Sequence, residues 1–301
     1  MDTNNAMNEP IAILSSESLA QALGELRPKL HRYCARMTGS VIDGEDVVQE
    51  VLVKAIEAFS EAEPIVNAEG WLFRITHNAA LDFLRRRARQ DALLAEEALD
   101  MTADPVSTSD DRLTVTASLR TFMRLPTSQR STVILRDVLG YSLGEIGALL
   151  DSSLPAVKAA LHRGRARLRE IATEADERPL PVLADAERAR LLDYVSRFNA
   201  RDFEGLRDLL ADDVQLELVS RFRRRGRDVV QNYFGRYRER QDWQLVPGLV
   251  EGRSAVIVQD ASSRAVLYFV LLAWAGEQVS DIRDFRYARY AMEGAELFVA
   301  A

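Results

Sequence analysis

Residues 142–168 read SLGEIGALLDSSLPAVKAALHRGRARL and decide the fold of the chain around them. Ser142-Leu143-Gly144-Glu145 has the Ser-x-x-Glu spacing of a capping box, so a helix is predicted to begin here and to run through Leu150. Asp151-Ser152-Ser153 predicts a turn. Pro155 suits the first turn of a second helix, where its missing N–H costs little. The stretch therefore predicts a short helix, a tight turn and a longer helix.

The second predicted helix has an apolar face and a basic face. At spacings of three and four, one face carries Leu154, Val157, Leu161, Gly164 and Leu168. The opposite face carries Lys158, His162, Arg163, Arg165 and Arg169. A basic second helix after a short first helix and a tight turn is the helix-turn-helix pattern, whose second helix enters the major groove of DNA. A plain helical hairpin with a solvated charged face is the alternative.

Residues 17–89 carry three more helical patterns. The apolar residues of the first are Leu19, Leu23, Leu26, Leu30, Tyr33 and Met37. Those of the second are Val47, Val48, Val51, Leu52, Ala55, Ile56 and Phe59. The third begins near Glu69, and its inward-facing residues are Trp71, Leu72, Ile75, Ala79 and Phe83. Because each set recurs at helical spacing, we expect a three-helix domain.

Two linkers separate the predicted domains. Residues 90–111 form the first linker, which is acidic. Over residues 88–111, one arginine (Arg89) and seven Asp or Glu residues give a net charge of −6. Residues 112–175 form the helical domain around the helix-turn-helix, and 176–184 form a second linker with Pro179 and Pro181.

Residues 185–301 change character. Two short helical patterns precede an alternating strand, Val214–Leu218, and a further helix precedes strand-like runs from Gln244 to Tyr287. Helices first and strands after, without regular alternation, predict an α+β domain with a curved antiparallel sheet. The fold class is therefore multidomain, with two all-α domains followed by an α+β domain.

Charge and composition narrow the function. The net charge of −7 argues against binding nucleic acid over the whole surface, but arginines cluster at 85–89, 163–169 and 221–227. The single cysteine, Cys34, cannot form an internal disulfide, and three scattered histidines predict no metal site. No cofactor is expected. Because the sequence shows no signal peptide and no apolar run of membrane-spanning length, we expect a cytoplasmic protein with no membrane partner.

Two stretches resemble region 2 and region 4 of the extracytoplasmic-function (ECF) sigma factors of bacteria. Region 2 is matched by Gly44–Lys54 and by Trp71–Arg87. Region 4 is matched by Leu125–Arg130, Arg136–Ser142, Glu145-Ile146 and Val157–Arg165. The resemblance implies a sigma factor that binds core RNA polymerase and promoter DNA and starts transcription.

The resemblance also assigns roles to residues. The polymerase-binding surface would be Asp46, Gln49, Glu50 and Lys54. The minus-ten element would meet Arg74, Asn78, Asp82, Arg85, Arg86 and Arg87. The minus-thirty-five element would meet Ser153, Lys158, His162, Arg163 and Arg165. The loop from Ser60 to Gly70 would be the wall of a pocket for an unstacked base, whereas Trp71 falls on the apolar stripe and is expected in the core.

The sequence departs from the family pattern in small ways. Gly144 and Gly147 stand in a helix at a cost of about 0.5–1 kcal/mol each, and His77 stands where a smaller or basic residue is more usual. These departures put the promoter preference in doubt.

The C-terminal segment resembles the SnoaL-like members of the NTF2-like superfamily, a cone of curved sheet around helices. Asp202-Phe203, Leu209–Val214 and Gly226–Val230 carry the resemblance. Residues that could line such a cone are Asp213, Asp228, Tyr237, Trp243, Tyr268 and Trp274. We expect a cone without catalytic residues that modulates the sigma domains, with the Arg221–Arg227 run and the Asp281–Arg286 tail as possible intramolecular contacts. An NTF2-like enzyme or ligand sensor with DNA-binding modules, and a conventional helix-turn-helix regulator, are the alternatives.

Overall fold

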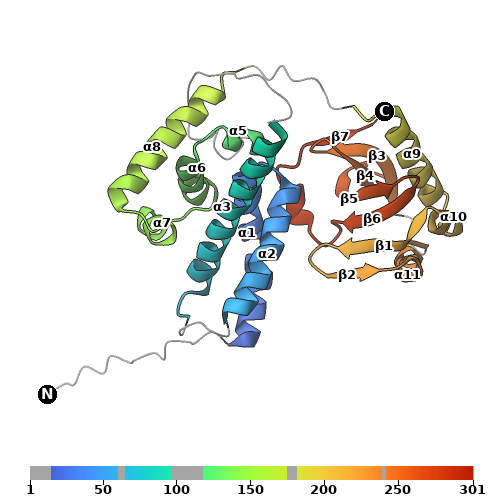
Figure 1. Ribbon diagram of the computed structural model, residues 1–301, viewed down its shortest axis with the longest axis horizontal. Helices are drawn as coiled ribbons and strands as arrows, with labels where there is room; N and C mark the ends of the chain where they lie inside the picture. Colours follow the sequence, from blue (N-terminus) through green and yellow to red (C-terminus); the bar gives the residue numbers. More distant parts are fainter. Residues whose placement is uncertain (1–14, 60–64, 96–117, 175–181, 239–241, 301) are drawn as a thin grey trace. The chain divides into compact units, whose positions relative to one another are not determined.

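The computed structural model describes residues 15–59, 65–95, 118–174, 182–238 and 242–300 (Figure 1). The chain divides into two compact units, Met1–Ala175 and Asp176–Ala301. Residues 96–111 of the predicted acidic linker, residues 176–181 of the second linker and residues 60–64 of the predicted base-pocket loop lie outside the described ranges. The domain boundaries predicted above stay predictions.

Three long helices begin the first unit: α1 (Ser16–Thr38), α2 (Val41–Phe59) and α3 (Ala68–Ala95). The Ser15 side chain caps α1, and Gly39 ends it at φ +79°, a left-handed conformation that suits glycine. Gly44 lets α2 approach α1, because a Cβ at this position would lie 2.6 Å from the Ala35 amide nitrogen. The three predicted helices are confirmed.

The other described elements of the first unit are also helical. It comprises α5 (Leu119–Met123), α6 (Thr127–Val133), the π-helical turn η1 (Ile134–Val138), α7 (Leu143–Leu150) and α8 (Leu154–Ile171). Both hydrogen bonds of the predicted capping box at Ser142 are present. Asp151 adopts a left-handed turn at φ 49°, and Ser153 caps α8 with Pro155 in its first turn. The predicted helix-turn-helix is confirmed.

One hydrophobic cluster runs through these helices. It joins Tyr33, Met37 and Phe73 of α1 and α3 to Phe122 of α5 and Leu161 of α8. The guanidinium of Arg130, 5% exposed, donates to the carbonyl oxygens of Met37 (2.6 Å), Met123 (3.0 Å) and Leu125 (2.9 Å). The two helical segments therefore share a core and a buried polar anchor.

Two residues assigned to inward faces lie outside. Leu154 is 46% exposed because it begins α8 before the helix packs, and the buried face starts at Val157. Ile56 is 61% exposed and lies on the outer face of α2. The inward assignment of both was wrong, since apolar character alone does not fix which residue at the edge of a stripe is covered.

The second unit opens with α9 (Asp185–Asn199) and α10 (Phe203–Asp208), and α11 (Arg227–Arg238) follows the second strand. Its strands are β1 (Leu210–Leu218), β2 (Phe222–Arg225), β3 (Trp243–Val250), β4 (Arg253–Asp260), β5 (Val266–Ala275), β6 (Gln278–Asp284) and β7 (Leu297–Val299), with the turn η2 (Arg289–Met292) before β7.

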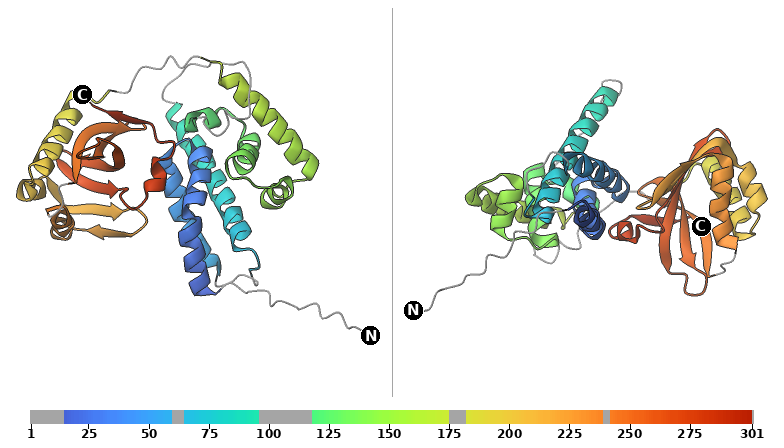
Figure 2. Two further views of the ribbon diagram at one scale, coloured as in Figure 1. Left: turned by 180° about the vertical axis from the view of Figure 1, so that it is seen from behind. Right: turned by 90° about the horizontal axis from the view of Figure 1, so that it is seen from below.

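These strands form one curved sheet in the order β2-β1-β6-β5-β4-β3-β7, with the helices against its concave face (Figures 1 and 2). The pairings are antiparallel except that β1 and β6 run parallel. The α+β cone is confirmed, and the expectation of a purely antiparallel sheet was wrong. The difference arises because β1 and its neighbour β6 are far apart in the chain and need no hairpin.

Candidate nucleic-acid interface

The basic face of α8 is built by the packing of its opposite face. Gly164 makes the close approach possible, since a Cβ there would lie 2.7 Å from Cγ2 of Val133 on α6. Val157 and Leu161 on the same side of α8 are also buried, whereas Lys158, His162 and Arg163 are exposed. Ser153 is also exposed, and its hydroxyl accepts from the Ala156 amide at 3.4 Å. Four of the five predicted minus-thirty-five residues thus lie on the surface of the second helix.

Arg165 differs from these four. Its guanidinium makes a two-pronged ion pair with Asp137, from Nε to Oδ2 at 3.0 Å and from Nη2 to Oδ1 at 2.6 Å. The Asp137 side chain is only 9% exposed and that of Arg165 is 29% exposed. The planar fork of arginine suits this geometry. Arg165 therefore holds α8 against η1, a role that the sequence did not indicate.

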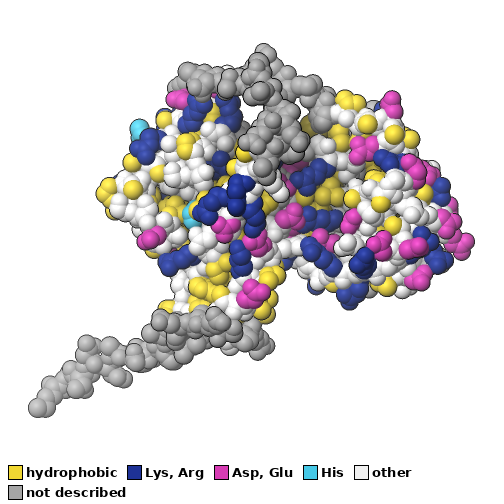
Figure 3. Space-filling model, in the orientation of Figure 1, with side chains coloured by type: hydrophobic (Ala, Val, Ile, Leu, Met, Phe, Trp, Pro, Cys, Tyr) yellow, Lys and Arg dark blue, Asp and Glu magenta, His cyan; other side chains and the backbone are white. Residues whose placement is uncertain are grey.

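The predicted minus-ten residues follow one face of α3. Arg74, Asn78 and Arg85 are exposed. Figure 3 shows Lys and Arg side chains, interspersed with acids, gathered over α2 and α3. Asp82 accepts from Arg85 at 2.6 Å, and the Arg74 guanidinium donates to the carbonyl oxygen of Ala148 on α7 at 3.2 Å. The face is basic, and α7 touches one end of it.

Arg86 and Arg87 tie α3 to α2. Arg86 pairs with Glu50 at 2.7 Å, and Arg87 pairs with Asp43 at 2.8 Å. Lys54 also pairs with Glu50 at 2.7 Å. The hydrogen bond from Arg86 is the main reason why the pKa of Glu50 lies below its usual value. Two predicted DNA-binding arginines thus also serve the packing of the helices.

Trp71 and His77 of α3 are both partly buried. Trp71 is partly buried and packs against the cluster of Leu19, Leu23, Ala55 and Leu72. His77 is mostly buried and its Nδ1 lies 2.7 Å from the Tyr33 hydroxyl. Burial lowers the pKa of His77 to about 4, so its ring is neutral near pH 7. His77 is therefore a packing residue and carries no charge toward DNA.

The predicted polymerase-binding residues share the outer side of α2. Asp46 is exposed, and Gln49, Glu50 and Lys54 are half-buried. Sequence reasoning missed two apolar neighbours, Val53 (55% exposed) and Ile56 (61% exposed). The spacing of 46, 49, 53 and 56 places these four residues on one helix face, and this spacing was the signal that could have revealed them.

The acids expected to line the cone lie outside it. Asp213 is exposed and pairs with Arg225 at 2.7 Å, and Asp228 is exposed and pairs with Arg207 at 2.9 Å. Tyr237, Trp243 and Tyr268 are buried as expected, whereas Trp274 is only partly buried, with the Arg190 guanidinium 5.4 Å from its ring centre. The assignment of Asp213 and Asp228 was wrong because both fall on outward-facing positions beside arginines.

The buried acid of the cone is Asp284, at the end of β6. Its carboxylate accepts from the hydroxyls of Tyr233 (2.7 Å) and Tyr237 (2.9 Å) and from the Arg286 amide (2.7 Å). Full burial raises the pKa of Asp284. The sequence suggested a surface contact here, and for Asp284 that was wrong because three donors replace the water it loses.

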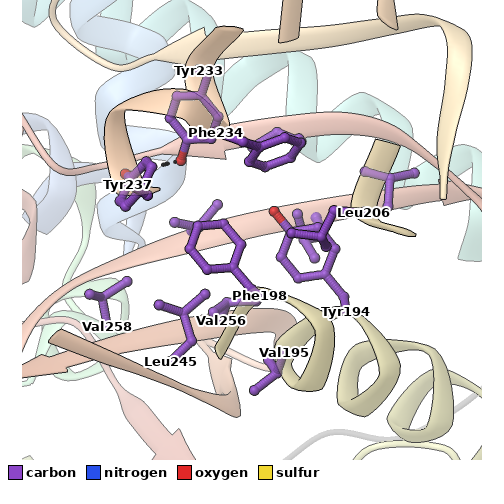
Figure 4. Packing of buried hydrophobic residues seen from close by; sticks show 14 of the residues in the cluster. Tyr194, Val195, Phe198, Leu206, Tyr233, Phe234, Tyr237, Leu245, Val256 and Val258 are labelled. Carbon is purple, nitrogen blue, oxygen red and sulfur yellow. Dashed lines mark hydrogen bonds between the residues drawn. The ribbon is translucent and has the colours of Figure 1, made fainter. Parts of the chain in front are cut away.

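Side chains fill the interior of the cone. Phe198 lies among Tyr194, Tyr237 and the aliphatic residues of the sheet (Figure 4). The cavity that these residues line measures about 10 Å³, which is about the space of one water molecule. The cone therefore holds no space for an organic substrate at this point.

Within the described ranges, no group of three or more His, Cys, Asp or Glu side chains is placed to hold a metal ion. No helix among these residues has the length and apolar character needed to cross a bilayer.

Comparison with known proteins gives two family matches: Sigma-70 region 2 over residues 23–90 and Sigma-70 region 4 over residues 119–168. The ECF RNA polymerase sigma factor SigE of Mycolicibacterium smegmatis is 35% identical over 150 residues, which are 47% of this chain and 56% of SigE. The chain thus spans little more than half the length of that relative.

Two further proteins are similar over larger shares of their length. The RNA polymerase sigma factor CarQ of Myxococcus xanthus is 33% identical over 150 residues, which cover 49% of this chain and 84% of CarQ. The crystal structure of the extracytoplasmic function sigma factor SigJ of Mycobacterium tuberculosis is also similar, at 20% identity and a TM-score of 0.37. The match covers 88% of this chain and 95% of the SigJ chain. With both sigma-70 regions matched in order and CarQ covered over most of its length, the chain belongs to the extracytoplasmic-function RNA polymerase sigma factors.

Proposed function

We propose that this chain binds core RNA polymerase and directs promoter-specific initiation of transcription, reading the minus-ten and the minus-thirty-five element with separate surfaces. The observation that carries the proposal is the capped helix-turn-helix, whose second helix exposes Lys158, His162 and Arg163 and buries its other face. Membership of the family supplies the expected partner.

The exposed face of α8 suits duplex DNA. In helix-turn-helix proteins the start of the second helix meets base edges. Ser153 and Lys158 lie in that part of α8, and His162 and Arg163 follow one turn later. We therefore assign base contacts to Ser153 and Lys158 and phosphate contacts to Arg163. Arg165 is assigned to the Asp137 ion pair and supports the helix.

The exposed face of α3 suits single-stranded DNA. Arg74 and Arg85 supply cations along the helix, and the amide of Asn78 between them can bond a base edge. Arg86 and Arg87 hold α3 to α2 and add positive charge beside this face. Melted promoter DNA would lie along α3 in this proposal.

The outer side of α2 suits a protein partner. Exposed apolar side chains flanked by polar residues are typical of interfaces. Val53 and Ile56 give this face its apolar part, and Asp46 and Gln49 give it polar groups. We assign this face to core RNA polymerase.

The second unit would modulate the first. Each unit has its own hydrophobic cluster, so the second can act as a regulatory module. The filled interior around Phe198 disfavours the alternative of an NTF2-like enzyme, since a substrate pocket needs several hundred Å³. A conventional helix-turn-helix regulator would not need α3 and the exposed face of α2.

A promoter-library transcription assay tests the proposal. Core polymerase is incubated with random promoter fragments and either the full chain or a chain ending at Glu174, and transcript ends are sequenced. Transcripts sharing two spaced motifs are expected. Lys158→Ala should weaken dependence on the upstream motif, and Arg264→Ala, an exposed arginine of the second unit, should not. A chain that gives no promoter-specific transcript in either form is not a sigma factor, and stronger transcription by the shorter chain would show inhibition by the second unit.

A further inference from the structure

A cleft of about 760 Å³ lies in the first unit between α3 and α7, two helices that contact each other. One wall is the segment that leads into α3 and its first turns, residues 65–74. The other wall is the segment from Leu139 to Leu149, and Lys29 of α1 also belongs to the lining. Region 2 and region 4 therefore each supply one side.

The walls combine apolar and aromatic side chains with charged ones. They include the side chains of Ile65, Val66, Trp71, Leu139 and Leu149 and the ring of Tyr141. A cleft of this volume, in which apolar and aromatic side chains stand beside a few placed charged groups, falls in the size range of sites for small organic molecules. The lining thus favours a flat apolar body.

Three of the four charged groups in the lining are already engaged. Glu69 accepts from both Lys29 and the Tyr141 hydroxyl, and the Lys29 ammonium also lies 4.2 Å from the centre of the Tyr141 ring. Glu145 closes the capping box with Ser142. These contacts hold the side chains of Lys29, Glu69 and Glu145, so both acids of the cleft already have hydrogen-bond partners.

Arg74 is the fourth charged group. Among the described lining residues it is the cation without a carboxylate partner, and its recorded bond goes to the Ala148 carbonyl at 3.2 Å. A guanidinium has five N–H donors, so most of its donors can serve a ligand. An anionic group is its natural partner.

We propose that this cleft binds a small molecule with a flat aromatic body and one anionic group, with the body between the apolar walls and the anion on Arg74. Because the two walls belong to different regions, a bound ligand stabilises the arrangement in which regions 2 and 4 meet. Arg74 also belongs to the proposed minus-ten face. If the proposed function holds, the ligand therefore competes with promoter DNA and restrains initiation.

A pair of fluorescent probes tests the site without polymerase or DNA. 8-Anilinonaphthalene-1-sulfonate carries the aromatic body and an anion, and N-phenyl-1-naphthylamine is the same body without the sulfonate. Each is titrated into the full chain. Arg74→Gln should weaken sulfonate binding at least about tenfold and leave the neutral probe within about twofold. Arg89→Gln, an exposed arginine farther along α3, should change neither.

A second variant fills the cleft. Ala148 is an exposed residue of α7 in the lining, so Ala148→Trp adds an indole without disturbing the core. This variant should abolish the saturable, one-per-chain binding of both probes, and circular dichroism should show unchanged helix content. Unchanged binding of both probes to Arg74→Gln and to Ala148→Trp would overturn the site. Because no transcription is measured, that result would leave the proposed function standing.

Discussion

The ion pair with Asp137 predicts that Arg165 stabilises the fold, and this contribution can be measured. Arg165→Ala leaves the Asp137 carboxylate, 9% exposed, without its guanidinium. Removing one partner of a fully buried pair costs about 3–5 kcal/mol, and the 29% exposure of Arg165 reduces this by solvent screening to about 2 kcal/mol. In a unit of this size, that free energy lowers Tm by about 4–8 °C.

The assay is thermal unfolding of the full chain, followed by the helical signal in circular dichroism. Lys158→Ala is the matched control, since Lys158 is exposed on the same helix and should change the free energy of unfolding by less than about 0.5 kcal/mol. With Asp137→Ala, a double-mutant cycle should give a coupling of about 1–2 kcal/mol. If Arg165→Ala unfolds at the wild-type temperature and weakens DNA binding as much as Lys158→Ala, the reasoning is refuted.

Three further predictions follow from buried groups. Because the pKa of His77 is about 4 in the folded chain against 6.5 in the unfolded chain, the free energy of unfolding should be fully retained above pH 6.5 and fall by about 3 kcal/mol toward pH 4. His77→Gln should remove this part of the pH dependence in urea unfolding, and an unchanged profile would contradict it. Asp284→Ala removes the carboxylate that accepts from two tyrosine hydroxyls and one amide, and should lower the free energy of unfolding by about 3 kcal/mol, measured by calorimetry. Asp213→Ala, whose exposed carboxylate should matter little, is the control. Gly44→Ala should lower the free energy of unfolding by about 1–3 kcal/mol, because the added methyl group pushes α2 away from the Ala35 backbone. Gly24 has open space around it, so Gly24→Ala should be tolerated. Equal stability of the two variants would refute the close packing at Gly44.

Local rules predicted the helical unit well. The Ser142 capping box, the Asp151–Ser153 turn and Pro155 each act within one helical turn, so the residues concerned are neighbours in the sequence. The exposure of Lys158, His162 and Arg163 followed from helical periodicity alone.

Contacts between distant residues could not be predicted in this way. Asp137 and Arg165 are 28 positions apart, and their pairing depends on how α8 packs on η1. Asp284 and Tyr233 are 51 positions apart and meet only because α11 lies against the sheet. Periodicity predicts on which side of a helix or strand a residue lies, but it does not predict which side chain of another element it meets. For this reason Arg165 was assigned to DNA and Asp284 to the surface.

Site-specific crosslinking tests the two-surface account most directly. A photo-crosslinking p-benzoyl-phenylalanine is placed at the position of Lys158 or of Asn78, and each chain is assembled with core polymerase on a promoter identified by the library assay. The account predicts that the label at 158 crosslinks to duplex DNA at the minus-thirty-five element and that the label at 78 crosslinks to the melted strand at the minus-ten element. Crosslinks from both positions to the same element, or from neither position to promoter DNA, would contradict it.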